Sequence, residues 1–196
     1  MRRTVLVLTA LLVPVVVLAA RPKPKPDEIV NNPPFAHWSA FPKGTSVTQR
    51  EIVTLADGKK IQHDITTKLI AKTRQKVVLQ TTIKATSGTA GGNSAVDNQV
   101  MVTTYPAKVK MSAADTPEAA MESVTEGTEQ VEVKGRKVDA EWVEAVMKSG
   151  DETTIDKMWT ARDIPGGIIK RTITKKKGDK VSSESTLEMI GFKKGS

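Results

Sequence analysis

The chain has 196 residues, a formal net charge of +8 and no cysteine. Without cysteine it can form no disulfide and offers neither a thiol nucleophile nor a zinc–thiolate site, so packing and backbone pairing must hold the fold. The basic excess favours anionic partners such as lipid head groups, although a solubilising surface charge is the simpler explanation. No nucleic-acid-binding motif occurs, and we expect no nucleic-acid partner.

The first twenty residues have the pattern of a secretory signal peptide. Arg2 and Arg3 precede an apolar run of 16 residues, 5–20, that ends in small side chains. A membrane-spanning helix needs about 20 apolar residues, and Pro14 interrupts this run. We therefore expect cleavage after Ala19 or Ala20 and export to the periplasm or the extracellular space. The alternative is an uncleaved N-terminal anchor, which would be the only membrane attachment.

Residues 21–34 alternate proline with lysine and end in Asn-Asn-Pro-Pro. Proline fixes its own φ angle and disfavours helix in the residue before it. The composition predicts an extended, solvated linker. A single domain is then expected over residues 35–196, which is long enough to bury a core.

From residue 35 onward the pattern alternates strand and turn. Residues 61, 63, 65, 67 and 69 are mostly apolar with polar residues between them, and this period of two predicts a half-buried strand. Glycine-containing turns separate stretches rich in Val, Ile and Thr. We predict ten strands, near 45–56, 60–72, 76–85, 97–104, 107–112, 128–134, 137–148, 153–161, 167–176 and 180–192.

Two segments depart from this pattern. Residues 86–96 are small and polar and predict a loop between neighbouring strands. In residues 113–126, Thr116 followed by Pro117 and an alanine-rich stretch is a helix start signal. Both a short helix and an acidic loop remain open there.

The predicted fold class is all-β with at most one short helix. Several strands exceed the usual five or six residues, and long antiparallel strands twist and coil. Because the connections in the C-terminal half have hairpin length, we expect a curved antiparallel meander of about ten strands, barrel-like or a half-barrel.

No catalytic constellation or phosphate-binding motif is present, so we expect no enzyme activity, no catalytic residue and no cofactor. The two histidines are His37 and His63. His63 falls on the apolar side of its strand, and the neighbouring Asp64 must point the opposite way. These residues therefore cannot chelate one ion together, and we predict no metal site.

Three side chains are candidates for lining a ligand cavity: Trp142, Trp159 and Leu187. The simpler interpretation is that they are ordinary core residues. The segment Pro165-Gly166-Gly167 is the sharpest local motif. It could form the rim of a binding mouth, or it could be a tight turn, since proline presets a turn and glycine permits a positive φ.

Several of these motifs resemble a known group. They are His37-Trp38, Phe41-Pro42-Lys43-Gly44-Thr45, Lys157-Met158-Trp159-Thr160 and Asp163-Ile164-Pro165-Gly166-Gly167. Over residues 35–193 the chain resembles uncharacterised exported bacterial β proteins. It is also similar to the curved sheets of periplasmic lipoprotein-carrier and outer-membrane lipoprotein proteins. That resemblance implies an open half-barrel with helices over a concave face that binds acyl chains.

Two functional hypotheses follow. The first is a non-enzymatic exported envelope protein that binds an apolar or amphipathic, lipid-like ligand on the concave face of its sheet. The second is a structural or protein-interaction module of the envelope, with a plugged core and an exposed edge strand that holds a protein partner.

Overall fold

The computed structural model describes residues 28–87, 99–110 and 120–196. The signal-peptide prediction and most of the predicted linker lie outside these residues. The described part contains one helix and eleven strands. Their bounds are β1 (Ile29–Asn31), α1 (Pro33–Ser39), β2 (Ser46–Leu55), β3 (Lys60–Lys72), β4 (Lys76–Ser87), β5 (Gln99–Pro106), β6 (Lys108–Lys110), β7 (Ala120–Val133), β8 (Arg136–Ser149), β9 (Glu152–Thr160), β10 (Ile168–Lys177) and β11 (Lys180–Lys193).

All ten predicted strands are present, most of them within two residues of the expected bounds. Within the segment 113–126, for which a short helix and an acidic loop were both expected, residues 120–126 form neither, because they belong to strand β7 and pair with β8. The rest of the segment 113–126 lies outside the described residues. Helix α1 begins at Pro33 and follows strand β1, so β1 and the first two residues of α1 lie in the predicted linker.

Nine strands form one antiparallel sheet in the order β5-β4-β3-β2-β11-β10-β9-β8-β7. The sheet therefore consists of two meanders, β2 to β5 and β7 to β11, joined where the last strand pairs with the first long one. Strands β1 and β6 form a separate pair. The edge strands β5 and β7 do not pair with each other, so the curved sheet is open and is not a closed barrel.

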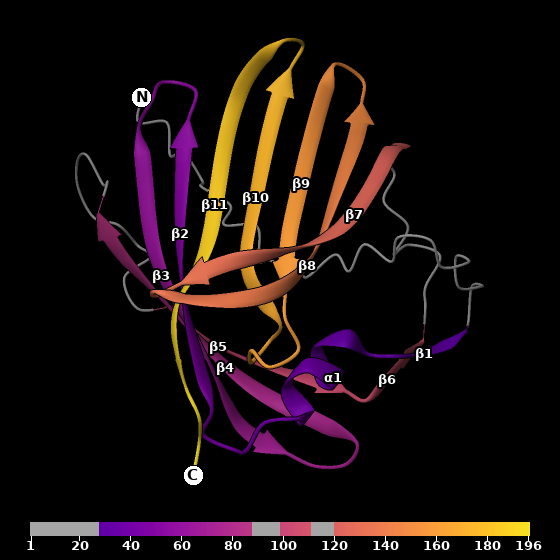
Figure 1. Cartoon of the computed structure of the whole chain (residues 1–196), viewed down its shortest axis with the longest axis vertical. Coiled ribbons are helices and arrows are strands. Elements are labelled where there is room, and N and C mark those ends of the chain that lie inside the picture. The colour runs from indigo at the N-terminus through magenta and orange to yellow at the C-terminus, as the bar shows by residue number, and fades with distance from the viewer. Residues whose placement is uncertain (1–27, 88–98, 111–119) are drawn as a thin grey trace, which may run out of the picture.

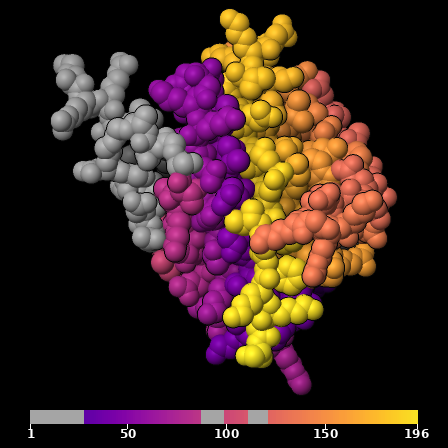
Figure 2. Space-filling model, turned by 60° about the vertical axis from the view of Figure 1, so that its left-hand side comes forward, coloured from indigo at the N-terminus to yellow at the C-terminus, as the bar shows by residue number. Residues whose placement is uncertain are grey.

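The β7–β8 hairpin turns at Lys134 and Gly135, which have φ angles of 50° and 74°. Positive φ at both central residues is typical of the two-residue turn that matches the twist of long strands. This end of the hairpin bends across the front of the sheet and lies against β11 (Figures 1 and 2). The bend brings Val133 into the same core as Ile169 and Met189.

The core is small and mainly aliphatic. Its buried members include Val47, Leu69 and Val77 from the first meander, and Trp159 and Ile169 from the second. Helix α1 lies over the ends of β4 and β5 and adds Trp38, which is 4% exposed. Among the described residues, no helix is long and apolar enough to cross a membrane.

The Pro165-Gly166-Gly167 segment packs against helix α1. Pro165 is fully buried, and a Cβ atom added to Gly167 would lie 2.6 Å from Nδ1 of His37. The backbone N–H of Gly167 donates to the carbonyl of Ile164, and the N–H of Ala161 donates to that of Gly167. Burial under this turn lowers the pKa of His37 below its usual value. The segment is therefore a tight turn in a packed region.

We expect the Gly167→Ala variant to lose about 1–3 kcal/mol of unfolding free energy. Gly167 has a φ of 78°, where a side chain is strained, and its new methyl group would collide with His37. The control is Gly150→Ala, since Gly150 also has a positive φ of 62° but open space around its Cβ position. Urea unfolding measures both variants, and equal losses would show that the contact with His37 is unimportant.

Candidate functional site

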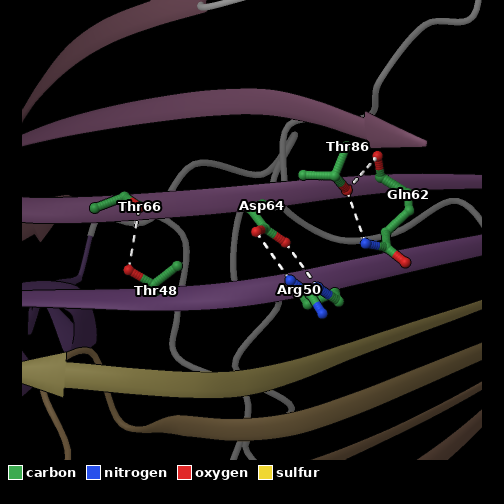
Figure 3. A network of polar contacts seen from close by, with 6 residues as sticks. All are labelled: Thr48, Arg50, Gln62, Asp64, Thr66 and Thr86. Carbon is green, nitrogen blue, oxygen red and sulfur yellow. Dashed lines mark hydrogen bonds and ion pairs between the residues drawn. The ribbon is translucent and has the colours of Figure 1, made fainter.

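The two faces of the central strands differ in character. Figure 3 shows the polar face of β2, β3 and β4, where Arg50 donates from Nε and Nη2 to Asp64 at 2.8 and 3.1 Å. The hydroxyls of Thr48 and Thr66 are 3.1 Å apart on the same face. The hydrogen bond from Arg50 lowers the pKa of Asp64. This face is a set of cross-strand polar pairs that solvent can reach.

The opposite face of six strands, β8 to β11 followed by β2 and β3, forms two rows of directly paired residues. We call these twelve residues the Arg171 face. The first row is Ala145, Asp156, Ile173, Ser185, Val53 and Ile61; the second is Val143, Met158, Arg171, Leu187, Glu51 and His63. Seven of the twelve are apolar, and every one is buried or half-buried.

An ion pair lies inside this face. Arg171 donates from Nε to Oδ1 of Asp156 at 2.9 Å and from Nη2 to Oδ2 at 2.6 Å. Both side chains are only 8% exposed. A bidentate arginine–carboxylate pair is the strongest form of such a contact. The low exposure makes each partner dependent on the other, because an isolated buried charge is very unfavourable.

Two buried nitrogen atoms in the second row of the Arg171 face have no hydrogen-bond partner among the described residues. They are Nη1 of Arg171 and Nδ1 of His63. Leaving a buried donor unsatisfied costs about 1–3 kcal/mol, so native proteins rarely do so without a reason. Between these two residues in the row, Glu51 accepts a hydrogen bond from the hydroxyl of Ser185 at 3.1 Å.

The structure separates the three predicted lining residues. Trp142 and Trp159 are directly paired, and Trp159 pairs next with Lys170 and then Glu188. Leu187 instead pairs with Arg171, and successive residues of a strand point to opposite faces. Leu187 therefore belongs to the Arg171 face while the two tryptophans lie on the other face, so these three residues do not line one cavity.

Charged side chains contact both tryptophans. The ammonium of Lys157 lies 4.2 Å from the ring centroid of Trp142 and 4.9 Å from that of Trp159. The indole N–H of Trp159 donates to Glu129. These cation–π and hydrogen-bond contacts account for the tryptophans as structural residues.

A small open groove of about 260 Å³ lies where the end of β7 approaches β10 and β11. Ligand pockets usually measure about 300–1,000 Å³, and this groove falls below that range. None of the six residues that the sequence singled out lines it, including Pro165, Gly166 and Gly167. We take the Arg171 face, rather than this groove, as the candidate site.

Sequence reasoning did not find Arg171 or Asp156. A signal was present, because Arg171 has the same strand parity as the buried Ile169 and the half-buried Ile173. A charged residue at an inward position of an alternating strand requires a partner. His63 was assigned to the apolar side of its strand, and it is buried there at 6% exposure.

His63 and Asp64 point to opposite faces, since His63 pairs with Glu51 while Asp64 bonds to Arg50. Among the residues that the structure describes, no group of three or more metal-ligating side chains comes together.

No protein-family model and no curated protein matches this sequence. Among solved structures, the chain is similar to a protein from Bacteroides fragilis described as exported, with a YmcC-like fold. The identity is 14%, the match covers 79% of this chain and 97% of that one, and the TM-score is 0.44. It is also similar to an outer membrane lipoprotein-sorting protein domain from Vibrio parahaemolyticus, at 10% identity, with 79% and 86% covered and a TM-score of 0.29.

The resemblance noted from the sequence concerned the same two kinds of protein, exported β proteins and lipoprotein-sorting sheets. Both identities and both TM-scores are low. What those two proteins do therefore says nothing about a ligand of this chain, and the residues of the Arg171 face must supply the functional argument.

Proposed function

We propose that this chain is a non-enzymatic, exported envelope protein that binds an amphipathic ligand on the Arg171 face. The observation that carries the proposal is the combination of seven apolar side chains with a buried guanidinium whose Nη1 has no partner among the described residues. Small-molecule sites are built in this way, from a mainly apolar surface and a few placed polar groups. The N-terminal signal-peptide pattern supports export.

The test is native mass spectrometry on protein exported with its own leader, followed by solvent extraction. We expect a discrete adduct that extracts as an amphiphile, and an intact mass that reports cleavage near Ala19 or Ala20. Protein that is always free of adduct, and that takes up no amphiphile when one is offered, would overturn the proposal.

A matched pair of variants locates the adduct. Ile173→Gln places an amide on the Arg171 face and should abolish the adduct, because a half-buried apolar contact is replaced by an unpaired polar group. Thr172→Gln makes the same substitution one residue earlier, on the opposite face, and should retain the adduct. Loss of the adduct in both variants would place it elsewhere.

The second candidate, a protein-interaction module, is favoured by edge strand β5. This strand carries no charged residue, and Val100 and Val102 are 58% and 59% exposed. An uncharged edge with exposed β-branched side chains can accept a further strand. Retention of a protein partner by ligand-free protein would favour this function over the first.

A further inference from the structure

Arg171 has hydrogen-bonding capacity that its ion pair does not use. A guanidinium has five N–H donors, and the bonds to Asp156 engage Nε and Nη2. Both N–H groups of Nη1 lack an acceptor among the described residues. A ligand that offers an oxygen to Nη1 would therefore satisfy donors that the described residues leave unpaired.

The charges of the Arg171 face determine whether the ligand oxygen that binds Nη1 should be anionic or uncharged. The carboxylate of Asp156 already compensates the guanidinium, and Glu51 lies in the same row two strands away, at about 10 Å. The lysines of this region, Lys157 and Lys170, fall on the other face. An anionic head group would be a third negative charge near one positive charge in a poorly hydrated place, which is unfavourable.

We propose that the ligand is recognised through an uncharged acyl carbonyl, as in an acyl ester, which accepts hydrogen bonds from Nη1 of Arg171. This inference rests on the proposed function and specifies its ligand class. The acyl chain contacts two apolar neighbours of Arg171: Leu187, which is its partner on β11, and Ile173, which lies two residues further along β10. Met158 pairs directly with Arg171 and is half-buried, and its flexible side chain can adapt to a ligand bound beside Arg171.

The test compares three probes with the same twelve-carbon chain, titrated by calorimetry below their micelle concentrations. Monolauroylglycerol has an ester carbonyl, monododecyl glyceryl ether lacks it, and laurate is anionic well above the pKa of a carboxylic acid. For the wild-type protein we expect the ester to bind about tenfold or more tightly than the ether, because a hydrogen bond to a charged donor is gained. Laurate should also bind more weakly than the ester.

The variant that removes the donor is the double substitution Asp156→Leu with Arg171→Met, because replacing both partners leaves no unpaired buried charge. In it, the ratio of ester to ether affinity should fall to about one. The matched control is Arg50→Met with Asp64→Leu, which removes an ion pair of the same bidentate geometry from the polar face. That control should keep the wild-type ratio.

The outcomes separate this inference from the proposed function. Equal binding of ester and ether by the wild-type protein, or tightest binding of laurate, would overturn the recognition of an uncharged carbonyl and leave amphiphile binding standing. An unchanged ratio in the Asp156/Arg171 double variant would likewise remove Arg171 as the donor. If none of the three probes binds, both proposals fail.

Discussion

We expect the Asp156→Ala variant to lose about 3–5 kcal/mol of unfolding free energy, because it leaves the guanidinium of Arg171 buried without its counter-charge. Nη1 of Arg171 already lacks a partner among the described residues, so no second acceptor there is positioned to compensate. Urea unfolding followed by circular dichroism measures the loss.

Two controls interpret this result. Asp64→Ala breaks the pair with Arg50 on the polar face, where the side chains are 23% and 40% exposed, and should cost far less because water screens the remaining charge. The double variant Asp156→Leu with Arg171→Met should recover most of the stability, since a buried ion pair can be replaced by apolar residues of similar volume. Equal losses for Asp156→Ala and Asp64→Ala would contradict the burial argument.

The Trp38→Ala variant should lose about 3–5 kcal/mol, as expected for removal of a buried aromatic side chain and the cavity that remains. Trp38 is 4% exposed, and its indole lies beside Gly166, so the substitution also removes the contact between helix α1 and the turn before β10. Thermal or urea unfolding measures the loss, and hydrogen exchange should show α1 opening first.

Trp38→Phe keeps an aromatic ring in this place and should lose considerably less than the alanine variant. Phe192→Ala is the surface control, because Phe192 is 41% exposed and its removal leaves little buried cavity. A loss for Trp38→Ala no greater than that for Phe192→Ala would mean that helix α1 does not contribute to the core.

The strands could be predicted because their signals are local. Alternation of apolar and polar residues and the turn glycines are both read within a few positions, and they gave β3 and β10 nearly to the residue. Helix α1 was not predicted because a seven-residue helix is unstable alone and depends on tertiary packing, such as the burial of Trp38 in the core. Residues 120–126 have a helix-like composition, but pairing with β8 overrides this propensity.

The site could be predicted only in part. The alternation of apolar and polar residues places Leu187 and His63 on the apolar sides of their strands. Both side chains are buried in the structure. Which face of β11 matches which face of β9 depends on cross-strand register, and the bulges at Ile169 and Ile190 interrupt that register. The sequence therefore could not show that Trp142 and Trp159 lie on the opposite face from Leu187.

The sequence by itself determined that this is an antiparallel β protein with hairpins in the order in which they occur along the chain. The pairing of β11 with β2 was decided only by the tertiary structure, because it joins residues 46–55 to residues 183–193. No local pattern encodes such a contact. Bringing these distant segments together costs chain entropy, and this cost is offset only when the two meanders form one sheet. That pairing brings Glu51 and His63 into the row of Arg171 and so creates the candidate site.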